Sequence, residues 1–291
     1  PLEILGSFDS KVAQPGQSLL MVSTTGEQFA YYELDAALQK ASSADGMVAH
    51  SSGDVAAALE AASSRFEAVY EQAFLSHSPL EPMTCVAHVR PDGCDLWVGT
   101  QVPVFAQQTA ASITGLKPEQ VVVHNQLIGG AFGRRLDYDF IAQAVAIARQ
   151  VSYPIKLIWS REEDMTHDMY RPHYVDRLTA ALDADGKPQG WQHRIAGASV
   201  LARYIGSLPE SGVDSDAVEV AIDPIYALDS LQVNYIREEP KAIPVSWWRG
   251  VGPLRSTLAL MQTLGSWSDE MLRLLFVCAI TTVFLFCFDV A

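Results

Sequence analysis

The chain has 291 residues, which is enough for one large domain or two and for a substantial core. Hydrophobic residues make up 49% and charged residues 19% of the chain, which excludes a disordered protein. The net charge is −14 at pH 7 and no run is rich in Lys or Arg. We therefore exclude non-specific nucleic-acid binding, which needs a basic face.

The first third of the chain predicts a short helix, an extended segment and a hairpin. Asp54 is a suitable N-cap for a helix that follows it, and residues 66–74 have an extended pattern. Residues 87–90 and 95–99 flank the turn Pro91-Asp92-Gly93 and predict a hairpin.

The cysteines do not form a metal-ligand or disulfide framework. Cys85 and Cys94 flank the predicted hairpin turn, so they lie on its two arms and either neighbour each other or are buried free thiols, the commoner outcome. Cys278 and Cys287 fall in an apolar C-terminal stretch that offers no support for a zinc or iron–sulfur site.

The middle of the chain combines helices with strands. Residues 105–114 have helical spacing and end at Gly115, and Val121 begins an apolar strand. Residues 138–150 predict the clearest helix, with one apolar face formed by Phe140, Ile141, Ala144, Val145 and Ala148.

Further strands are predicted downstream. Residues 155–159 form a buried-looking strand, 174–183 and 189–197 flank the hairpin turn Asp185-Gly186, and 231–235 have weak strand character. Parallel-type and hairpin-type strands together with packed helices predict an α+β fold with mixed sheets.

The glycine-rich segment Gly129-Gly130-Ala131-Phe132-Gly133-Arg134-Arg135 lies between the predicted strand at Val121 and the helix at 138–150. Such a turn lets backbone N–H groups approach an anion, and a helix N-terminus adds favourable partial charge. The segment lacks the Gly-Lys-Ser/Thr of a Walker A motif and the spacing of GxGxxG. A tight turn that packs against its own helix is the alternative.

Other segments place this loop in a family context. Trp97-Val98-Gly99-Thr100-Gln101-Val102-Pro103 precedes it and Trp247-Trp248-Arg249-Gly250-Val251-Gly252-Pro253 follows far downstream. Further matching segments are 74–83, 159–165, 167–172 and 193–197. Together they resemble, collinearly over 49–253, the molybdenum-cofactor-binding large subunit of the xanthine dehydrogenase/aldehyde oxidase family. The branch is that of isoquinoline 1-oxidoreductase and nicotinate dehydrogenase large subunits and related membrane-associated aldehyde dehydrogenases.

The resemblance implies cofactor-binding roles for six residues. Gln101 matches the glutamine beside the metal's oxo group, since its amide donates without adding charge. Phe132 matches the aromatic residue of the glycine-rich loop, and Arg249 matches an arginine that approaches the cofactor from another loop. The close backbone approach is assigned to Gly129, Gly130 and Gly133.

Alternatives remain open for the polar residues. Without the resemblance, Gln101 is a surface glutamine at a strand end, and Arg249 pairs with Glu238 or Glu239. Arg134 and Arg135 mark the branch and either line the substrate funnel, bind phosphate, or pair with Asp137 and Asp139.

Several charged residues invite a catalytic interpretation that we do not adopt. His77 and Glu81 lie in a connector stiffened by prolines, which favours packing. The charged residues of 161–164 and 167–168 predict a solvated, mutually paired loop. The chain has no GxSxG elbow and no HExxH motif.

The resemblance implies hydroxylation of an N-heteroaromatic ring or an aldehyde with oxygen from water, at molybdenum held by a molybdopterin cytosine dinucleotide. Electrons would pass to iron–sulfur clusters on a small [2Fe-2S] partner subunit, with a cytochrome c as a further candidate acceptor. The family suggests a periplasmic or membrane-associated complex, although Pro1 begins no signal peptide. We assign no catalytic residue and no protein metal ligand, because no segment matches the surroundings of the family's general-base glutamate.

The segments divide the chain into a poorly matched 1–48, a cofactor-binding domain 49–253 and an apolar 254–291 that we expect to be non-family sequence from a truncation or frameshift. We therefore expect a partial chain that is inactive alone. One alternative is a non-catalytic scaffold or binding module. Another is a membrane-anchored fragment that uses Leu274 to Phe288, a stretch shorter than the roughly 20 residues of a membrane span.

Overall fold

The computed structural model describes residues 2–3, 20–23, 28–224, 226, 228–240 and 243–265. The chain forms two compact units, each built from separate stretches of sequence. The first comprises Pro1–Phe29, Leu75–Arg171 and Ala242–Arg249, and the second comprises Ala30–Phe74, Pro172–Lys241 and Gly250–Ala291.

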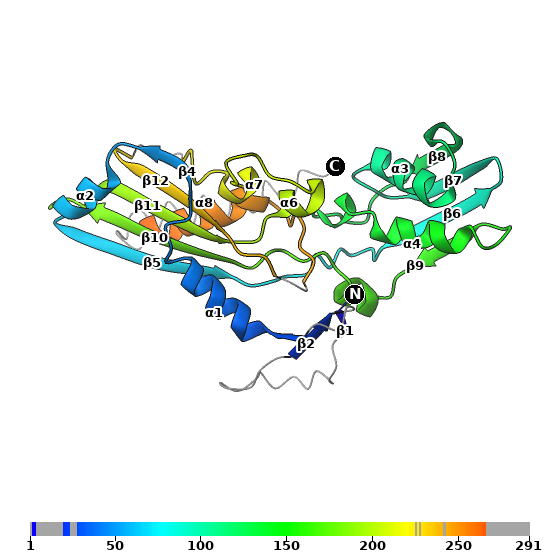
Figure 1. Cartoon of the computed structure of the whole chain (residues 1–291), viewed down its shortest axis with the longest axis horizontal. Helices are drawn as coiled ribbons and strands as arrows, with labels where there is room; N and C mark the ends of the chain where they lie inside the picture. The colour runs from blue at the N-terminus through cyan, green and yellow to red at the C-terminus, as the bar shows by residue number, and fades with distance from the viewer. Residues whose placement is uncertain are drawn as a thin grey trace. The chain divides into compact units, whose positions relative to one another are not determined.

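The first unit contains a four-stranded mixed sheet in the order β8-β7-β6-β9 (Figure 1). Its strands are β6 (Thr84–Arg90), β7 (Gly93–Val98), β8 (Val121–Asn125) and β9 (Ile155–Ile158). β7 pairs in parallel with β8, and the other pairs are antiparallel. Helices α3 (Pro103–Thr114) and α4 (Asp139–Ala148) share one hydrophobic core with the sheet.

The predicted hairpin is confirmed by the pairing of β6 with β7. Cys85 and Cys94 are both buried free thiols, as expected. α3 ends at Gly115, whose left-handed backbone and N–H bond to Ala111 form the predicted C-terminal cap.

The apolar face of α4 is also confirmed, since its buried residues are the five predicted ones, Phe140, Ile141, Ala144, Val145 and Ala148. The helix begins within one residue of its predicted start, with Tyr138 as its N-cap. A short 3₁₀ helix, η2 (Arg134–Leu136), follows Gly133, and α4 begins at Asp139. The glycine-rich loop therefore leads into a 3₁₀ turn and not directly into the N-terminus of α4.

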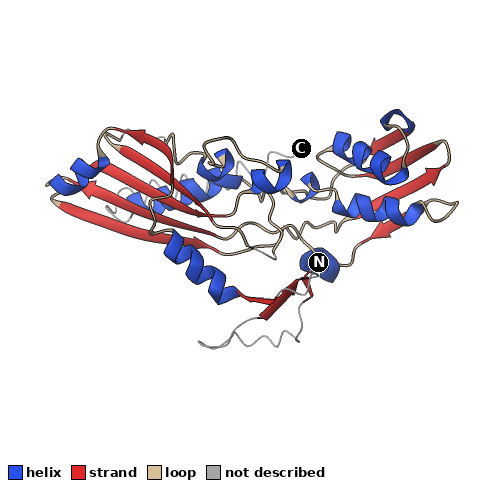
Figure 2. Cartoon of the chain, viewed as in Figure 1, coloured by secondary structure: helices blue, strands red, loops and turns tan. Residues whose placement is uncertain are grey.

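The second unit contains a five-stranded sheet in the order β4-β12-β11-β10-β5, whose strands are labelled in Figure 1. Figure 2 draws strands in red and helices in blue. The strands are β4 (Met47–Ser52), β5 (Ser64–Gln72), β10 (Tyr174–Leu182), β11 (Pro188–Gly197) and β12 (Leu231–Arg237). The predicted hairpin is β10–β11, and only β11 and β12 of this sheet pair in parallel. Both sheets are mixed and carry helices, which confirms the α+β class.

Helices of the second unit pack on both faces of its sheet. Leu38 of α1 (Tyr31–Ala41) packs with Val175 and Ala196. Ala259 and Leu260 of α8 (Val251–Gly265) join a different core, which includes Leu178, Trp191 and Tyr235. The shorter helices are α2 (Val55–Ala61), capped by Asp54 as predicted, α6 (Val200–Ile205) and α7 (Ser215–Val218).

A small sheet joins β1 (Leu2–Glu3), β2 (Leu20–Ser23) and β3 (Gln28–Ala30). Among the described residues, no helix combines the length and hydropathy needed to cross a membrane. The stretch Leu274 to Phe288, with Cys278 and Cys287, lies outside the described residues.

Candidate functional site

The glycine-rich loop has an unusual backbone. Gly130 and Gly133 have φ of 103°, and Phe132 has φ of 56°, a left-handed conformation that a non-glycine residue rarely adopts. The N–H groups of Gly130, Ala131, Phe132 and Gly133 donate to no other described residue. A run of backbone N–H groups without a partner among the described residues, in a loop with several positive φ angles, suits the binding of an oxyanion.

Close packing explains the glycines at both ends of the loop. A Cβ on Gly133 would lie 1.8 Å from the carbonyl oxygen of Trp247. A Cβ on Gly129 would lie 2.6 Å from Glu81 Cβ, and the Gly129 N–H donates to the Glu81 carboxylate at 2.8 Å. Neither position has room for a side chain, so the sequence of the loop is set by its neighbours.

Arg249 reaches the centre of this loop from the downstream segment. Its N–H donates to the carbonyl of Phe132 at 2.9 Å, and its guanidinium carbon lies 3.9 Å from the centre of the Phe132 ring. The guanidinium carbon of Arg249 also lies 5.6 Å from the centre of the Trp248 ring. The Nε of Arg249 is buried and has no hydrogen-bond partner among the described residues, which include no ion-pair partner either. Glu239, one of the alternatives, pairs with Arg237 instead.

Gln101 lies beside Arg135, the last residue of the glycine-rich segment. Its backbone N–H donates to the carbonyl of Arg135 at 3.1 Å, and its side chain is exposed. The neighbouring Thr100 hydroxyl donates to the same carbonyl at 3.2 Å. Backbone hydrogen bonds therefore join Gln101 to Arg135, at the end of the segment 129–135, and Arg249 to Phe132, near its centre.

Arg135 holds the loop from inside and is fully buried. Its guanidinium donates to the carbonyl of Gly130 at 3.1 Å, to that of Gly99 at 2.9 Å, and to the Glu81 carboxylate at 2.9 Å. Burial lowers the pKa of this guanidinium, and the nearby Glu81 opposes that shift. Each terminal nitrogen of Arg135 is thus engaged by the chain itself.

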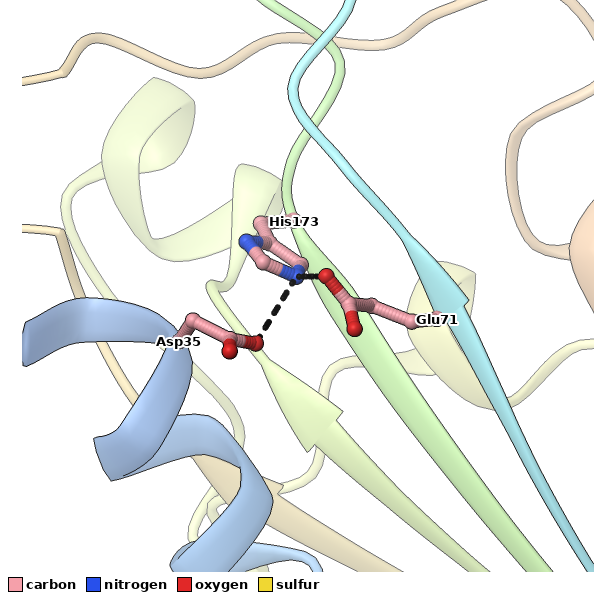
Figure 3. Close-up of side chains that lie close together, drawn as sticks. All are labelled: Asp35, Glu71 and His173. Atoms are coloured by element: carbon pink, nitrogen blue, oxygen red, sulfur yellow. Dashed lines mark ion pairs between the residues drawn. The ribbon is translucent and has the colours of Figure 1, made fainter. Parts of the chain in front are cut away.

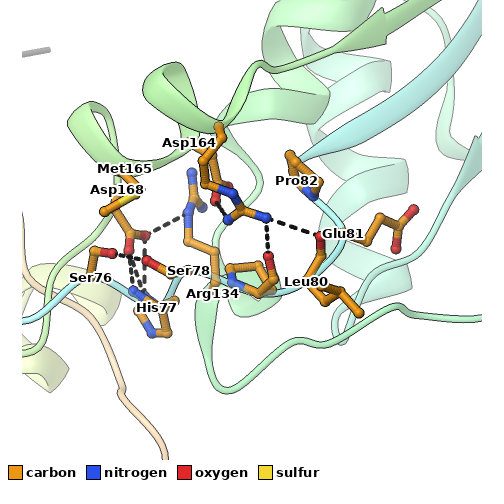
Figure 4. Close-up of polar contacts among 12 residues, drawn as sticks. Ser76, His77, Ser78, Leu80, Glu81, Pro82, Arg134, Asp164, Met165 and Asp168 are labelled. Atoms are coloured by element: carbon orange, nitrogen blue, oxygen red, sulfur yellow. Dashed lines mark hydrogen bonds and ion pairs between the residues drawn. The ribbon is translucent and has the colours of Figure 1, made fainter.

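Arg134 is equally buried and belongs to a network with His77 and Asp168 (Figure 4). Arg134 contacts both oxygens of Asp139 at 2.8 Å, and its Nε lies 2.9 Å from Asp168. His77 Nδ1 contacts Asp168 at 3.1 Å and its Nε2 lies 2.8 Å from the carbonyl of Trp247.

These contacts give the ion-pair partners of the two arginines. Pairing with Asp139 is found for Arg134, whereas Arg135 pairs with Glu81 and not with Asp137 or Asp139. Both side chains have zero exposure, so contact with substrate or phosphate would require the fold to open. His77 is buried, whereas the side chain of Glu81 is 40% exposed and pairs with Arg135.

The prediction of a solvated charged loop is wrong for two of its residues. Asp164 and Asp168 are each 1% exposed, whereas Glu162 and Glu163 are exposed as expected. Asp164 accepts from Arg161 at 2.7 Å within α5 (Arg161–Thr166), and Asp168 pairs as described above. The predicted mutual pairing is found for Arg161 with Asp164 and for His167 with Glu163. The partners of Asp168, which are Arg134 and His77, lie outside this loop, and a guanidinium beside a carboxylate allows it to be buried.

The sequence that contains this loop matches a known protein family. A family model described as molybdopterin cofactor-binding domain matches residues 39–271. The chain belongs to that family. The matched range extends beyond residues 49 and 253 on both sides, and it includes α8 of the second unit.

Named relatives are longer than this chain. The isoquinoline 1-oxidoreductase subunit beta of Brevundimonas diminuta is 33% identical over 183 residues, which are 60% of this chain and 23% of the relative. A membrane-bound aldehyde dehydrogenase [pyrroloquinoline-quinone] of Gluconacetobacter polyoxogenes is 27% identical over 63% of this chain and 25% of the relative. This chain thus spans about a quarter of the length of these relatives. The resemblance to large subunits of the xanthine dehydrogenase and isoquinoline oxidoreductase kind is confirmed.

A solved structure agrees in fold. Quinoline 2-oxidoreductase from Pseudomonas putida 86 superimposes with a TM-score of 0.64 at 18% identity, over 78% of this chain and 29% of the other. At this identity the likeness concerns the fold alone.

The residues at the loop fit the cofactor that the family name implies. An anionic ligand needs hydrogen-bond donors. Four consecutive N–H groups of Gly130 to Gly133 and the buried Arg249 Nε supply such donors and have no other partner among the described residues.

Proposed function

We propose that the loop Gly129–Gly133, with Gln101 and Arg249, forms part of the binding surface for a molybdopterin cofactor. The observation that carries the proposal is the stacking of Arg249 on Phe132, within a loop whose N–H groups have no partner among the described residues. The stack fixes the guanidinium, so its Nε keeps one direction. Fixed donors bind an anion with little loss of side-chain entropy.

Each residue has a role in holding the cofactor. The loop N–H groups would donate to anionic oxygens, Gln101 would donate its uncharged side-chain amide, and Arg249 would donate through Nε. Glu81 and Arg135 do not face the ligand in this proposal. They hold the loop backbone in shape through Gly129 and Gly130.

The reaction is proposed from the relatives. A molybdenum cofactor of this family, when bound, supplies the oxidation of an N-heteroaromatic ring or an aldehyde with oxygen from water. We propose that this chain contributes to such a reaction as part of a large subunit, with the cofactor in its cytosine dinucleotide form. Names such as isoquinoline 1-oxidoreductase and aldehyde dehydrogenase among the relatives support this substrate class.

The proposed partner is a small [2Fe-2S] subunit, with a cytochrome c as a further acceptor, because the word "subunit" in the name of the first relative implies an assembly. No residue of this chain is proposed as the general base. We therefore expect the chain to bind cofactor without turning over substrate by itself.

Metal and pterin analysis tests the proposal. The full chain is expressed in a host that makes the cytosine dinucleotide cofactor, and its molybdenum and pterin contents are measured. We expect about one of each per chain. For Arg249→Gln we expect occupancy at limiting cofactor to fall by about tenfold, because a lost hydrogen bond to a charged group costs roughly 1.5–3 kcal/mol.

The matched control is Arg194→Gln, since Arg194 pairs with the exposed Asp45 and lies in the second unit. This control should keep the wild-type molybdenum content. A folded wild-type chain without molybdenum or pterin would contradict the proposal and favour the non-catalytic scaffold.

A further inference from the structure

Asp35, Glu71 and His173 bring three metal-ligating side chains together within the second unit (Figure 3). They come from three separate elements, which are α1, β5 and the residue that precedes β10. One ligand atom from each residue lies within 4.8 Å of the other two. The cluster is separate in sequence and in structural unit from the glycine-rich loop.

The imidazole of His173 is the fixed point of the cluster. Its side chain is 1% exposed, and its Nε2 lies 3.1 Å from Glu71 Oε1 and 3.9 Å from Asp35 Oδ1. The ring of Phe74 packs edge-on against the imidazole at 5.6 Å between centroids. Packing therefore holds the ring with Nε2 directed at both carboxylates.

Two carboxylates meet at the imidazole of His173. Asp35 Oδ1 is buried without a hydrogen-bond partner among the described residues. Glu71 Oε2 accepts from the neutral amide of Gln39, one turn after Asp35 on α1, at 3.3 Å. Within the part of the chain that the structure describes, no Lys or Arg side chain forms an ion pair with either carboxylate.

We propose that Asp35, Glu71 and His173 bind a divalent transition-metal ion of the zinc class. One imidazole nitrogen and two carboxylate oxygens are a ligand set that zinc accepts, with a fourth position left for water. Metal–ligand bonds of about 2.0–2.1 Å place tetrahedral ligand atoms about 3.4 Å apart, a value between the two distances at Nε2. Two carboxylates and a neutral imidazole also balance the charge of the ion.

The site would fasten α1 to the five-stranded sheet. Glu71 lies on the edge strand β5, and His173 directly precedes β10, the neighbour of β5. Gln39 would orient the Glu71 carboxylate from outside the ligand set, as such partners do in metal sites. Solvent reaches the cluster from the side of the carboxylates, since the side chains of Asp35 and Glu71 are 31% and 41% exposed.

A competition titration with a chromophoric zinc chelator tests the site on the full chain after EDTA treatment. We expect one zinc per chain in the wild type. Asp35→Asn and Glu71→Gln keep side-chain shape, and each should weaken zinc binding by at least about tenfold. Gln39→Ala should weaken it by about tenfold, the effect usual for a residue that orients a ligand.

Glu163→Gln is the matched control, because Glu163 and His167 form an exposed pair at 3.3 Å without a second carboxylate. This variant should bind zinc as the wild type does. Equal zinc affinity in the wild type, Asp35→Asn and Glu71→Gln would overturn the proposal and leave an ordinary ion pair.

Cobalt substitution supplies an independent readout that needs no variant. The cobalt-loaded wild type should show visible absorption of a site with nitrogen and oxygen ligands. A thiolate-to-cobalt charge-transfer band would instead reveal binding at cysteine and would contradict the assignment. Neither experiment depends on the proposed molybdopterin site.

Discussion

At the scale of single residues, Gly133 is constrained most tightly. Its φ of 103° disfavours any residue with a Cβ, and that Cβ would overlap the carbonyl oxygen of Trp247 at 1.8 Å. The same carbonyl lies 2.8 Å from His77 Nε2. One backbone group of the downstream segment thus touches both the glycine-rich loop and the buried His77 network.

We expect Gly133→Ala to destabilise the protein by about 3 kcal/mol, because strain in the left-handed region adds to an overpacked contact. Gly115→Ala is the control, since Gly115 also has positive φ but a Cβ added there would meet no atom within 4 Å. It should cost only about 1–2 kcal/mol. Urea unfolding of both variants measures the difference in their free energies of unfolding. Equal losses would contradict this expectation and mean that the Trp247 backbone shifts to make room for the added Cβ.

Asp168 is the residue whose removal we expect to cost most in the first unit. Asp168→Asn would leave the guanidinium of Arg134 with less compensation, while His77 loses its carboxylate partner. Breaking a buried pair in this way typically costs about 3–5 kcal/mol.

The exposed Glu163→Gln again serves as the control and should change stability by no more than about 0.5 kcal/mol. Denaturant midpoints compare the two variants. A small effect of Asp168→Asn would mean that Asp139 alone satisfies Arg134.

Residue types predicted the loop better than they predicted its partners. The glycines and Phe132 mark a backbone that side chains cannot follow, and this signal is local. Asp139, the local partner of Arg134, was among the predicted alternatives. The other partners, Asp168 of Arg134 and Glu81 of Arg135, are far from them in sequence. Paired charges therefore could not be told from ligand-binding charges by spacing alone.

At the scale of elements, local patterns predicted those with strong periodicity or clear turns. The apolar face of α4 and the hairpins β6–β7 and β10–β11 fall in this group. The helix α8 was not predicted, because three of its buried residues are Arg255, Ser256 and Thr263. Its polar core face is explained only by tertiary partners such as Asp176 for Arg255.

The cysteines of the β6–β7 hairpin allow an element-scale prediction. Burial raises the pKa of Cys85 to about 12 and that of Cys94 to about 11. We expect neither thiol to react with a disulfide reagent in the folded protein at about pH 8, because the reactive thiolate is absent. Rapid labelling of folded protein would contradict the burial of this hairpin.

The experiment uses a variant with Cys278→Ser and Cys287→Ser, which leaves only the two hairpin thiols of the four in the chain. Guanidinium should make both of them react, which provides the positive control. The labelling rate at intermediate denaturant then reports the opening of the sheet.

At the scale of the whole molecule, the acidic composition makes stability depend on pH. Burial would raise the pKa of Asp176, but Arg255 and the hydrogen bond from His193 hold it below its usual range. Burial raises the pKa of Asp164 above its usual range, although Arg161 opposes the shift. The two carboxyls therefore act in opposite directions on the free energy of unfolding.

The signs follow from proton binding. An unfolded Asp titrates near pH 3.9, so the stabilisation from Asp176 is present above that pH and is lost as the pH falls towards its lower folded-state pKa. The stabilisation from Asp164 is present below that pH and is lost as the pH rises through its higher folded-state pKa.

Urea unfolding at about pH 5.5 and pH 3, on either side of the pI of 4.8, separates the two effects. On acidification Asp176→Asn should lose less free energy of unfolding than the wild type, and Asp164→Asn should lose more. The reverse order would mean that Arg255 does not dominate the environment of Asp176.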